Sequence, residues 1–347
     1  MKDLIDKLKK NNSLSKDEFV FLIKNRTPEI CEHIFKEADE VRKSVYGTDV
    51  YIRGLIEISN YCKNDCFYCG IRNSNTSLTR YRLSEEDILK CCMEGYSLGF
   101  RTFVLQGGED SFFSDDVMES IIRSIKESFP DCAVTLSLGE KSRSSYERLY
   151  RAGADRYLLR HETADNCHYK RLHPVYLSLD ERKKCLFDLR EIGYQVGTGF
   201  MVGSPFQTAE NLADDMCFLM KLKPHMVGIG PFLPHKDTPF KDYRQGDLEL
   251  TLFMIALTRL TLPNALIPAT TALSTLSSSG RIKGIMAGAN VIMPNLSPVN
   301  LRKLYSLYDG KAFLNEEAKE GLSKLMEQVK AAGYEIVSSR GDYKKEG

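Results

Sequence analysis

Short apolar runs rich in β-branched residues recur along the chain, with amphipathic segments between them. Eight such runs lie near residues 51–58, 102–106, 132–138, 156–160, 195–201, 225–230, 265–270 and 289–293. The segments between them have helical spacing and lie near residues 85–98, 115–128, 143–152, 179–192, 208–221 and 249–261. Continuous apolar strands that alternate with helices predict a parallel sheet covered on both faces. The count of eight favours a closed (β/α)8 barrel over the alternative, an open doubly wound sheet.

The two ends of the chain do not follow this alternation. The N-terminal residues have helical periodicity throughout, and a last amphipathic helix is expected near 315–332, followed by a charged tail. We therefore expect an α/β protein built on a TIM-type barrel over residues 48–312. An N-terminal helical extension over 1–47 and a C-terminal helix and tail over 313–347 would complete it.

The composition is that of a globular protein. The 347 residues are 42% hydrophobic and 27% charged, and 48 Lys+Arg against 47 Asp+Glu give a net charge of +1. Such a balance excludes broad electrostatic attraction to nucleic acid or to an acidic membrane surface. The opening residues, MKDLIDKLKKNNSLSKDE, lack the apolar region of a secretory signal, and no apolar stretch is typical of a membrane span. We therefore expect a cytoplasmic protein whose partners include neither nucleic acid nor a membrane.

Three of the ten cysteines lie unusually close together. Cys62, Cys66 and Cys69 follow the first expected strand with the spacing Cys-x3-Cys-x2-Cys, on a polar loop. Three thiolates on one loop can wrap a soft-metal centre. A closed zinc site needs a fourth ligand, and no histidine lies nearby in the sequence. A four-iron cluster held by three thiolates keeps one iron open to a ligand. Buried cysteines without a metal are the alternative, and they seldom have this spacing on a polar loop.

Polar and small residues also follow several other expected strands. The carboxyl ends of barrel strands meet at one face, so we expect these side chains around one cavity. Residues 106–109 (Gln-Gly-Gly-Glu) combine glycines that allow close approach with a carboxylate that can bind an ammonium group. Arg160 can hold a carboxylate and Glu162 an ammonium or a ribose hydroxyl, or the two can simply pair. Thr135 and Ser137 point to one side of their strand.

Motifs of several other enzyme classes are missing from the sequence. There is no Walker A element, no His-Glu-x-x-His and no Gly-x-Ser-x-Gly, and the glycines near 197–203 do not fit the Rossmann fingerprint. These absences weaken nucleotide hydrolase, zinc protease and α/β-hydrolase interpretations.

The cysteine loop, with an aromatic residue before the last cysteine, resembles the signature of the radical S-adenosylmethionine (SAM) enzymes. This resemblance implies that Cys62, Cys66 and Cys69 hold a 4Fe-4S cluster whose open iron binds SAM. One electron would then break a carbon–sulfur bond and give a 5′-deoxyadenosyl radical. The resemblance also implies a cofactor-binding set: Tyr68, Gln106, Gly107, Gly108, Glu109, Ser137, Glu162, Arg182, Met201 and Ile229.

The sequence segments at the strand ends are more specific than the cysteine motif. YRLSEEDI, VTLSLGE, AGADRYLLRHETAD, MVGIGPFLPHKDTP, IPATTAL and GANVIMPNLSP are similar to the HydE family of FeFe-hydrogenase maturases, from about residue 30 to about 310. This similarity implies a substrate cavity lined by Thr135, Arg160, Thr270, Thr271, Met293, Tyr305 and Tyr308. Some members bind a second cluster through three cysteines near the C-terminus. No cysteine follows Cys217 here, so we expect no second cluster there.

The HydE resemblance also implies a substrate and partners. The substrate would be a small organometallic complex, iron–cysteine carrying CO and cyanide, made by the maturase HydG. The radical would attack its sulfur, and the iron unit would pass to the scaffold HydF. A reductant such as ferredoxin or flavodoxin would supply the electron.

Two other interpretations stay open. A related barrel of the biotin synthase or methylornithine synthase type would act on an organic, amino-acid-type substrate, and an Asp or Lys clamp in the cavity would favour it. An iron–sulfur scaffold or electron-transfer protein without turnover is the second. A fully ligated cluster would suit that role better than a cluster with three cysteines.

Overall fold

The computed structural model describes residues 1–314 and 318–345. Its strands are β1 (Asp49–Ile52), β2 (Gly54–Ser59), β3 (Thr102–Gly107), β4 (Ala133–Ser137), β5 (Arg156–Leu158), β6 (Gln195–Val202), β7 (Met226–Pro231), β8 (Val291–Ile292) and β9 (Glu335–Val337). Its helices are α1 (Lys2–Asn11), α2 (Lys16–Lys24), α3 (Pro28–Tyr46), α4 (Glu85–Ser97), α5 (Asp115–Ser128), α6 (Arg143–Ala152), α7 (Asn166–Leu172), α8 (Leu179–Ile192), α9 (Ala209–Leu222), α10 (Leu248–Thr261), α11 (Thr271–Leu276), α12 (Gly280–Met286), α13 (Val299–Arg302) and α14 (Ala318–Ala331).

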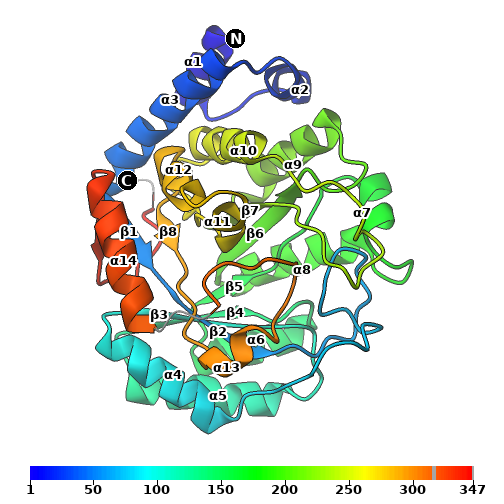
Figure 1. The fold of residues 1–347 in the computed structure, drawn as a ribbon, viewed down its shortest axis with the longest axis vertical. Coiled ribbons are helices and arrows are strands. Elements are labelled where there is room, and N and C mark those ends of the chain that lie inside the picture. Colours follow the sequence, from blue (N-terminus) through cyan, green and yellow to red (C-terminus); the bar gives the residue numbers. More distant parts are fainter. Residues whose placement is uncertain (315–317, 346–347) are drawn as a thin grey trace.

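The strands close into a barrel (Figure 1). Strands β2 to β7 form one parallel sheet in sequence order, and β1 pairs in parallel with β8 and β9. Single bridges join the remaining edges, namely Leu55 with Asn295, Met226 with Leu266 and Pro268 with Val291. The expected (β/α)8 barrel is therefore confirmed, and its strand ends meet at one mouth.

Two of the eight expected strands differ from the prediction. The run at 265–270 is not a strand but makes only isolated bridges, and Pro268 lacks the amide hydrogen that a regular ladder needs. The run at 51–58 is split at Arg53, where the chain changes partners from β8 and β9 to β3. Regular strand pairing therefore forms one side of the barrel, and isolated bridges close the other side.

The helices expected between the strands are all present, within a residue or two of the predicted ends. Each begins where its sequence provides a cap. At α4, for example, the Ser84 side chain accepts from the Asp87 amide and Asp87 accepts from the Ser84 amide. None of the helices in the described residues combines the length and the apolar character needed to cross a lipid bilayer.

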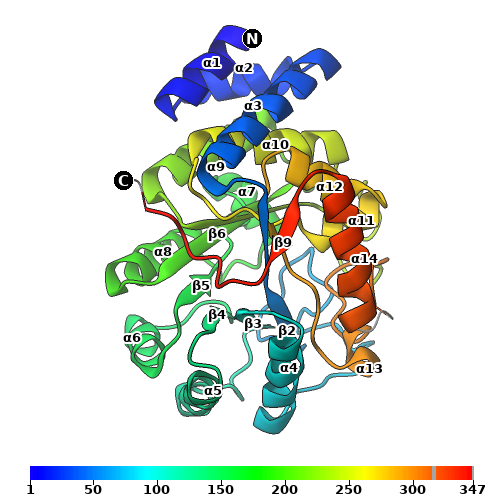
Figure 2. The same cartoon turned by 90° about the vertical axis from the view of Figure 1, so that its left-hand side faces the viewer.

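The N-terminal helices form a separate layer against the barrel (Figure 2). Helix α3 packs on α10, and α2 packs on α9. Their apolar faces join one large core with β6 and β7, while a second core lies between β2–β5 and helices α4, α5, α6 and α8. The expected helical extension is thus docked on one side of the barrel.

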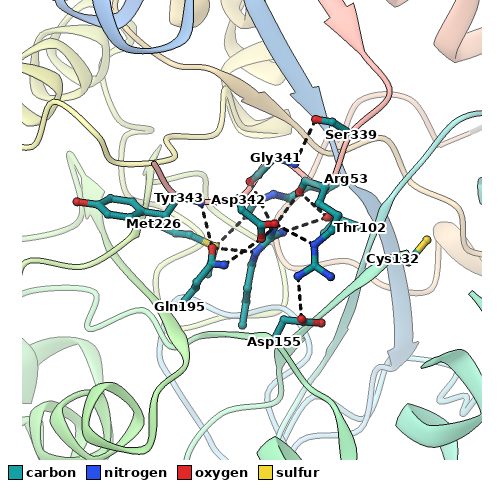
Figure 3. Close-up of polar contacts among 12 residues, drawn as sticks. Arg53, Thr102, Cys132, Asp155, Gln195, Met226, Ser339, Gly341, Asp342 and Tyr343 are labelled. Atoms are coloured by element: carbon teal, nitrogen blue, oxygen red, sulfur yellow. Dashed lines mark hydrogen bonds and ion pairs between the residues drawn. The ribbon is translucent and has the colours of Figure 1, made fainter. Parts of the chain in front are cut away.

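The C-terminal segment closes the base of the barrel. The helix expected near 315–332 is present as α14, and residues 315–317 of that expectation lie outside the described residues. After α14, strand β9 pairs with β1, and the following residues reach the starts of the strands (Figure 3). There the buried Arg156 donates to the Asp342 carboxylate (2.6 Å) and to the Arg340 carbonyl (2.8 Å). The charged tail is therefore an integral part of the fold.

Candidate active site

The cysteine loop follows β2 at the mouth of the barrel. Cys62, Cys66 and Cys69 all line one cavity of about 350 Å³. Backbone hydrogen bonds from other elements fix the loop: the Phe67 amide donates to the Leu172 carbonyl (2.9 Å). The expected grouping of the three thiols at one cavity is therefore present, on a loop held by tertiary contacts.

Two glycines let neighbouring segments approach this loop closely. A Cβ at Gly108 would lie 2.6 Å from the Cβ of Cys62 and would overlap the Tyr61 carbonyl. Gly139 has a positive φ of 75°, and a Cβ there would overlap the Glu109 side chain. Gly108 demands glycine because the Tyr61 backbone lies against it, and Gly139 demands it because of its positive φ and the Glu109 side chain beside it.

The donor set suits a multinuclear cluster. Burial raises the pKa of the Cys62 and Cys66 thiols and raises that of Cys69 to about 12. Such thiols give up their protons when a cation takes their place. Among the described residues, no three His, Cys, Asp or Glu side chains converge on a point as ligands of one metal ion do. Thiolates of a four-iron cluster bind different irons, so they need not converge.

Carboxylates and a guanidinium lie beside the cysteines. Glu109, at the end of the β3 turn, accepts from the Glu140 amide (3.0 Å) and pairs with Lys63 (3.1 Å). Arg182, on α8, lies 2.8 Å from the Glu140 carboxylate and donates to the Arg160 carbonyl at 3.2 Å. This part of the cavity therefore offers both charges, as a zwitterionic amino-acid group requires.

Arg160 and Glu162 follow β5, and the backbone is strained at Glu162. Glu162 has a φ of 64°, a left-handed value uncommon for a residue other than glycine. Its carboxylate lies 3.1 Å from the Arg160 guanidinium, although the two are not aligned as a hydrogen bond. Both line the cavity. His161 between them is buried and lies 2.8 Å from the Thr198 hydroxyl, so it is held within the fold.

Residues from later elements complete the cavity lining. They include Thr270, Thr271, Met293, Tyr305 and Tyr308. Gln106 donates to the Tyr305 hydroxyl (3.2 Å), and the Thr270 hydroxyl is buried without a hydrogen-bond partner in the described residues. An unpartnered buried hydroxyl is free to meet a ligand.

The cavity lining includes nearly every residue that the resemblance implied. Its members from that set are Cys62, Cys66, Cys69, Tyr68, Gln106, Gly107, Gly108, Glu109, Ser137, Glu162, Arg182, Met201, Arg160, Thr270, Thr271, Met293, Tyr305 and Tyr308. Thr135 and Ile229 are not among them. Thr135 is buried deeper along the same strand face as Ser137, and Ile229 packs in the core on the opposite face of its strand from the cavity.

Three cavity or loop partners were missed by the sequence reasoning. Glu57 and Lys311 line the cavity as an ion pair, and His173 lies 3.2 Å from the Tyr68 hydroxyl. Glu57 had a signal, since it is a carboxylate inside an apolar strand. Lys311 and His173 had none, because each meets its partner across more than a hundred residues.

Comparisons with known proteins place this site in a family. The Radical SAM superfamily model matches residues 56–219. A curated relative from Thermotoga maritima, the "[FeFe] hydrogenase maturase subunit HydE", is 46% identical over 302 residues, covering 87% of this chain and 86% of the relative. This chain belongs to the HydE family of radical SAM enzymes. The HydE family uses a 4Fe-4S cluster and SAM, so these are the cofactors of this chain.

More distant relatives of this HydE-family chain share its fold. A 3-methylornithine synthase from Methanosarcina acetivorans is 26% identical and covers 95% of this chain and 92% of its own. The solved structure of methylornithine synthase (PylB) superposes with a TM-score of 0.84 at 25% identity, covering 96% of this chain and 97% of that one. The structure of HydG, a maturase of the [FeFe]-hydrogenase, has a TM-score of 0.80 at 19% identity, covering 96% and 74%.

Proposed function

We propose that this chain acts in FeFe-hydrogenase maturation on an iron–cysteine complex carrying CO and cyanide, and that the adenosyl radical attacks its sulfur. The observation that carries the proposal is the charged cavity of about 350 Å³ beside three thiols, in a chain 46% identical to a HydE. HydG would supply the complex and HydF would receive the iron unit. A ferredoxin or flavodoxin would donate the electron.

Three cysteines would hold the cluster. When bound, the cluster supplies the electron that breaks a carbon–sulfur bond of SAM and so generates the 5′-deoxyadenosyl radical. Cys62, Cys66 and Cys69 fix its position through a loop tied to α7 by the Phe67 amide. The loop thus holds the reacting atoms against the cavity and away from bulk water.

The residues between the cysteines and β5 would bind SAM. The carboxylates of Glu109 and Glu162 suit its ammonium group and its ribose hydroxyls, and Arg182 suits its carboxylate. Ser137 adds a hydroxyl at the cavity wall. Tyr68 and Met201 cover the remaining apolar surface. These roles follow from chemistry and position, and they orient SAM toward the rest of the cavity.

Other residues of the cavity lining would bind the substrate. Arg160 and the threonine pair, Thr270 and Thr271, offer hydrogen-bond donors to an anionic, cyanide-bearing complex. The Nε atom of Arg160 has no hydrogen-bond partner among the described residues, so a donor is available without breaking a contact. Met293 and the two tyrosines, Tyr305 and Tyr308, would exclude water from the reaction.

One observation favours a second candidate, an organic amino-acid substrate. Lys311 and Glu57 place a charged clamp in the cavity, as an amino acid would need. The superposition on methylornithine synthase, with a TM-score of 0.84, agrees with this alternative in fold. The alternative and the main proposal predict different substrates for the same radical.

The deciding experiment uses anaerobically reconstituted holoenzyme with SAM and dithionite. We would quantify 5′-deoxyadenosine and adenosylated products with and without a synthetic iron–cysteine carbonyl-cyanide complex. Strong stimulation with an adenosylated sulfur product is expected. Cleavage of SAM that the complex does not stimulate, but that a free amino acid does, would reject the main proposal in favour of the second.

A further inference from the structure

A buried ion pair, Glu57 with Lys311, faces the cavity and has no role in the main proposal. Lys311 donates to one carboxylate oxygen of Glu57, and Asn295 donates to the other at 2.8 Å. The Glu57 side chain is 1% exposed and that of Lys311 is 11% exposed. Lys311 also donates to the Tyr305 carbonyl at 3.2 Å. The described residues thus accept two of its three N–H donors.

Stability alone does not explain this pair. Desolvating two charges commonly costs as much as their attraction returns, and packed apolar residues often serve a fold equally well. The other residues of the strand that carries Glu57 are buried, and all but Ser59 are apolar. Both members of the pair line a cavity and so have empty space beside them. A charge kept next to a cavity is available to a ligand.

Lys311 also has room to move. A second cavity, of about 50 Å³, adjoins it, and Leu55, Thr271, Met293 and Lys311 line both cavities. The lysine side chain therefore borders space in two cavities, whereas a close-packed structural lysine would border none.

The pair lines the same cavity as Arg160 and Tyr308. Burial raises the pKa of Tyr308 to about 12 and the charge of Glu57 adds to this shift, while a side-chain hydrogen bond with Thr275 and the charges of Arg281 and Arg160 oppose it. An anion bound in this cavity has the cations of both Arg160 and Lys311 in its walls.

We propose that Lys311 is a substrate-binding residue. Its ammonium pairs with Glu57 when no substrate is bound, and it binds the anionic end of the substrate from the side opposite Arg160 when substrate enters. This inference rests on the proposed function for the identity of the substrate. Glu57 competes with the substrate for the same ammonium, so it sets the affinity and keeps the lysine in place when the cavity is empty.

Two variants that should change the dissociation constant of the substrate complex in opposite directions test the inference. In Lys311→Met, the dissociation constant of the synthetic iron–cysteine carbonyl-cyanide complex should rise by roughly 10- to 100-fold, the effect of losing a hydrogen bond from a charged donor. In Glu57→Gln, the competing charge is gone while the shape is kept, so the complex should bind more tightly than to wild type. Lys311→Arg should recover part of the affinity. Lys303→Met, on an exposed lysine of the same segment, is the matched control.

Binding is measured on the holoenzyme with SAM, by equilibrium titration without reductant. A purely structural pair would weaken binding in both variants and would also raise the SAM dissociation constant, and either result overturns the inference. Equal affinity in Lys311→Met and Lys303→Met overturns it too. If the wild-type enzyme binds the complex but does not transform it, the proposed function fails, while the two opposite signs still decide the role of Lys311.

Discussion

The two ends of the barrel hold two arginines of one chain segment in different ways. Arg156 starts β5 at the base, and its guanidinium donates to Thr102, Gln195, Asp342 and two carbonyls of the C-terminal segment. Arg160, four residues later, faces the mouth and leaves its Nε without a hydrogen-bond partner in the described residues. The chain supplies the partners of Arg156 at the base and leaves a donor of Arg160 available at the mouth.

This difference separates stability from ligand binding. A buried cation that the chain itself neutralises contributes to the stability of the fold. A cation with unpaired donors contributes instead to the affinity for a ligand. Variants at the mouth should therefore change ligand affinity and catalysis with little change in the free energy of unfolding. Variants at the base should do the reverse.

The largest effect is expected from Cys66→Ala. With one of three thiolates gone, the cluster has no stable three-point attachment, and 5′-deoxyadenosine production should fall to background. The measurement is anaerobic SAM cleavage with dithionite, together with the EPR signal of the cluster. Cys167→Ala, on an exposed cysteine of α7, is the matched control and should keep both. Normal 5′-deoxyadenosine production by Cys66→Ala would end the cluster assignment.

The next effect is expected from Glu162→Ala. It removes a carboxylate that we place on SAM, so the SAM dissociation constant should rise about tenfold or more. Glu162→Gln keeps the shape at this left-handed position and should show most of the same loss. Equilibrium binding of SAM to reconstituted protein provides the measurement. Unchanged affinity would mean that Glu162 only pairs with Arg160 at the barrel rim.

At the base, Asp342→Asn should lower the free energy of unfolding by about 1–2 kcal/mol. The estimate is below that for a fully buried pair because the Asp342 side chain is 41% exposed and Arg156 keeps its other partners. The affinity for SAM should stay within experimental error of wild type. Chemical denaturation gives the first quantity and SAM titration the second. A SAM defect in this variant would break the separation of the two ends.

The same variant has a predicted pH dependence. Partial burial acts to raise the pKa of Asp342. Hydrogen bonds from Arg340 and the charge of Arg156 outweigh burial and hold this pKa well below its usual range. A lowered pKa stabilises the fold above the unfolded value of about 3.9 and loses that effect as pH falls toward the folded value. The stability difference between wild type and Asp342→Asn should therefore be full near pH 7 and shrink below about pH 4. A difference that grows on acidification would contradict this assignment.

Local patterns predicted the barrel, but not how it closes. The strands and helices follow from hydrophobic period and capping residues, which act within a few positions along the chain. The closure at Pro268 depends on a missing amide hydrogen in a stretch whose apolar pattern still looks like a strand. The tail looked like a charged surface segment because the buried Arg156 that it meets is 186 residues away.

The candidate site shows the same limit. Cys62, Cys66 and Cys69 are close in sequence, so their spacing alone predicted a common centre. The strand-end residues gather because barrel topology brings them together, and that is general knowledge of the fold. Which side chains turn inward at the edge of the cavity is a matter of packing, so Ile229 faces the core and Lys311 faces Glu57.

The smallest effect is expected from Arg53→Met at the base. Unlike Asp342→Asn, this change should raise the free energy of unfolding. Arg53 is buried where the first strand splits, and its Nη1 lies 2.9 Å from the Met226 sulfur. Its Nε and Nη2 have no hydrogen-bond partner among the described residues, so this buried guanidinium is only partly satisfied. Methionine of similar length removes the desolvated charge and fills the space, so the free energy of unfolding should rise by about 1 kcal/mol in chemical denaturation. A clear fall instead would show that Arg53 is held by the Asp342 network as Arg156 is. The base would then be neutralised as one unit, which sharpens its contrast with the mouth.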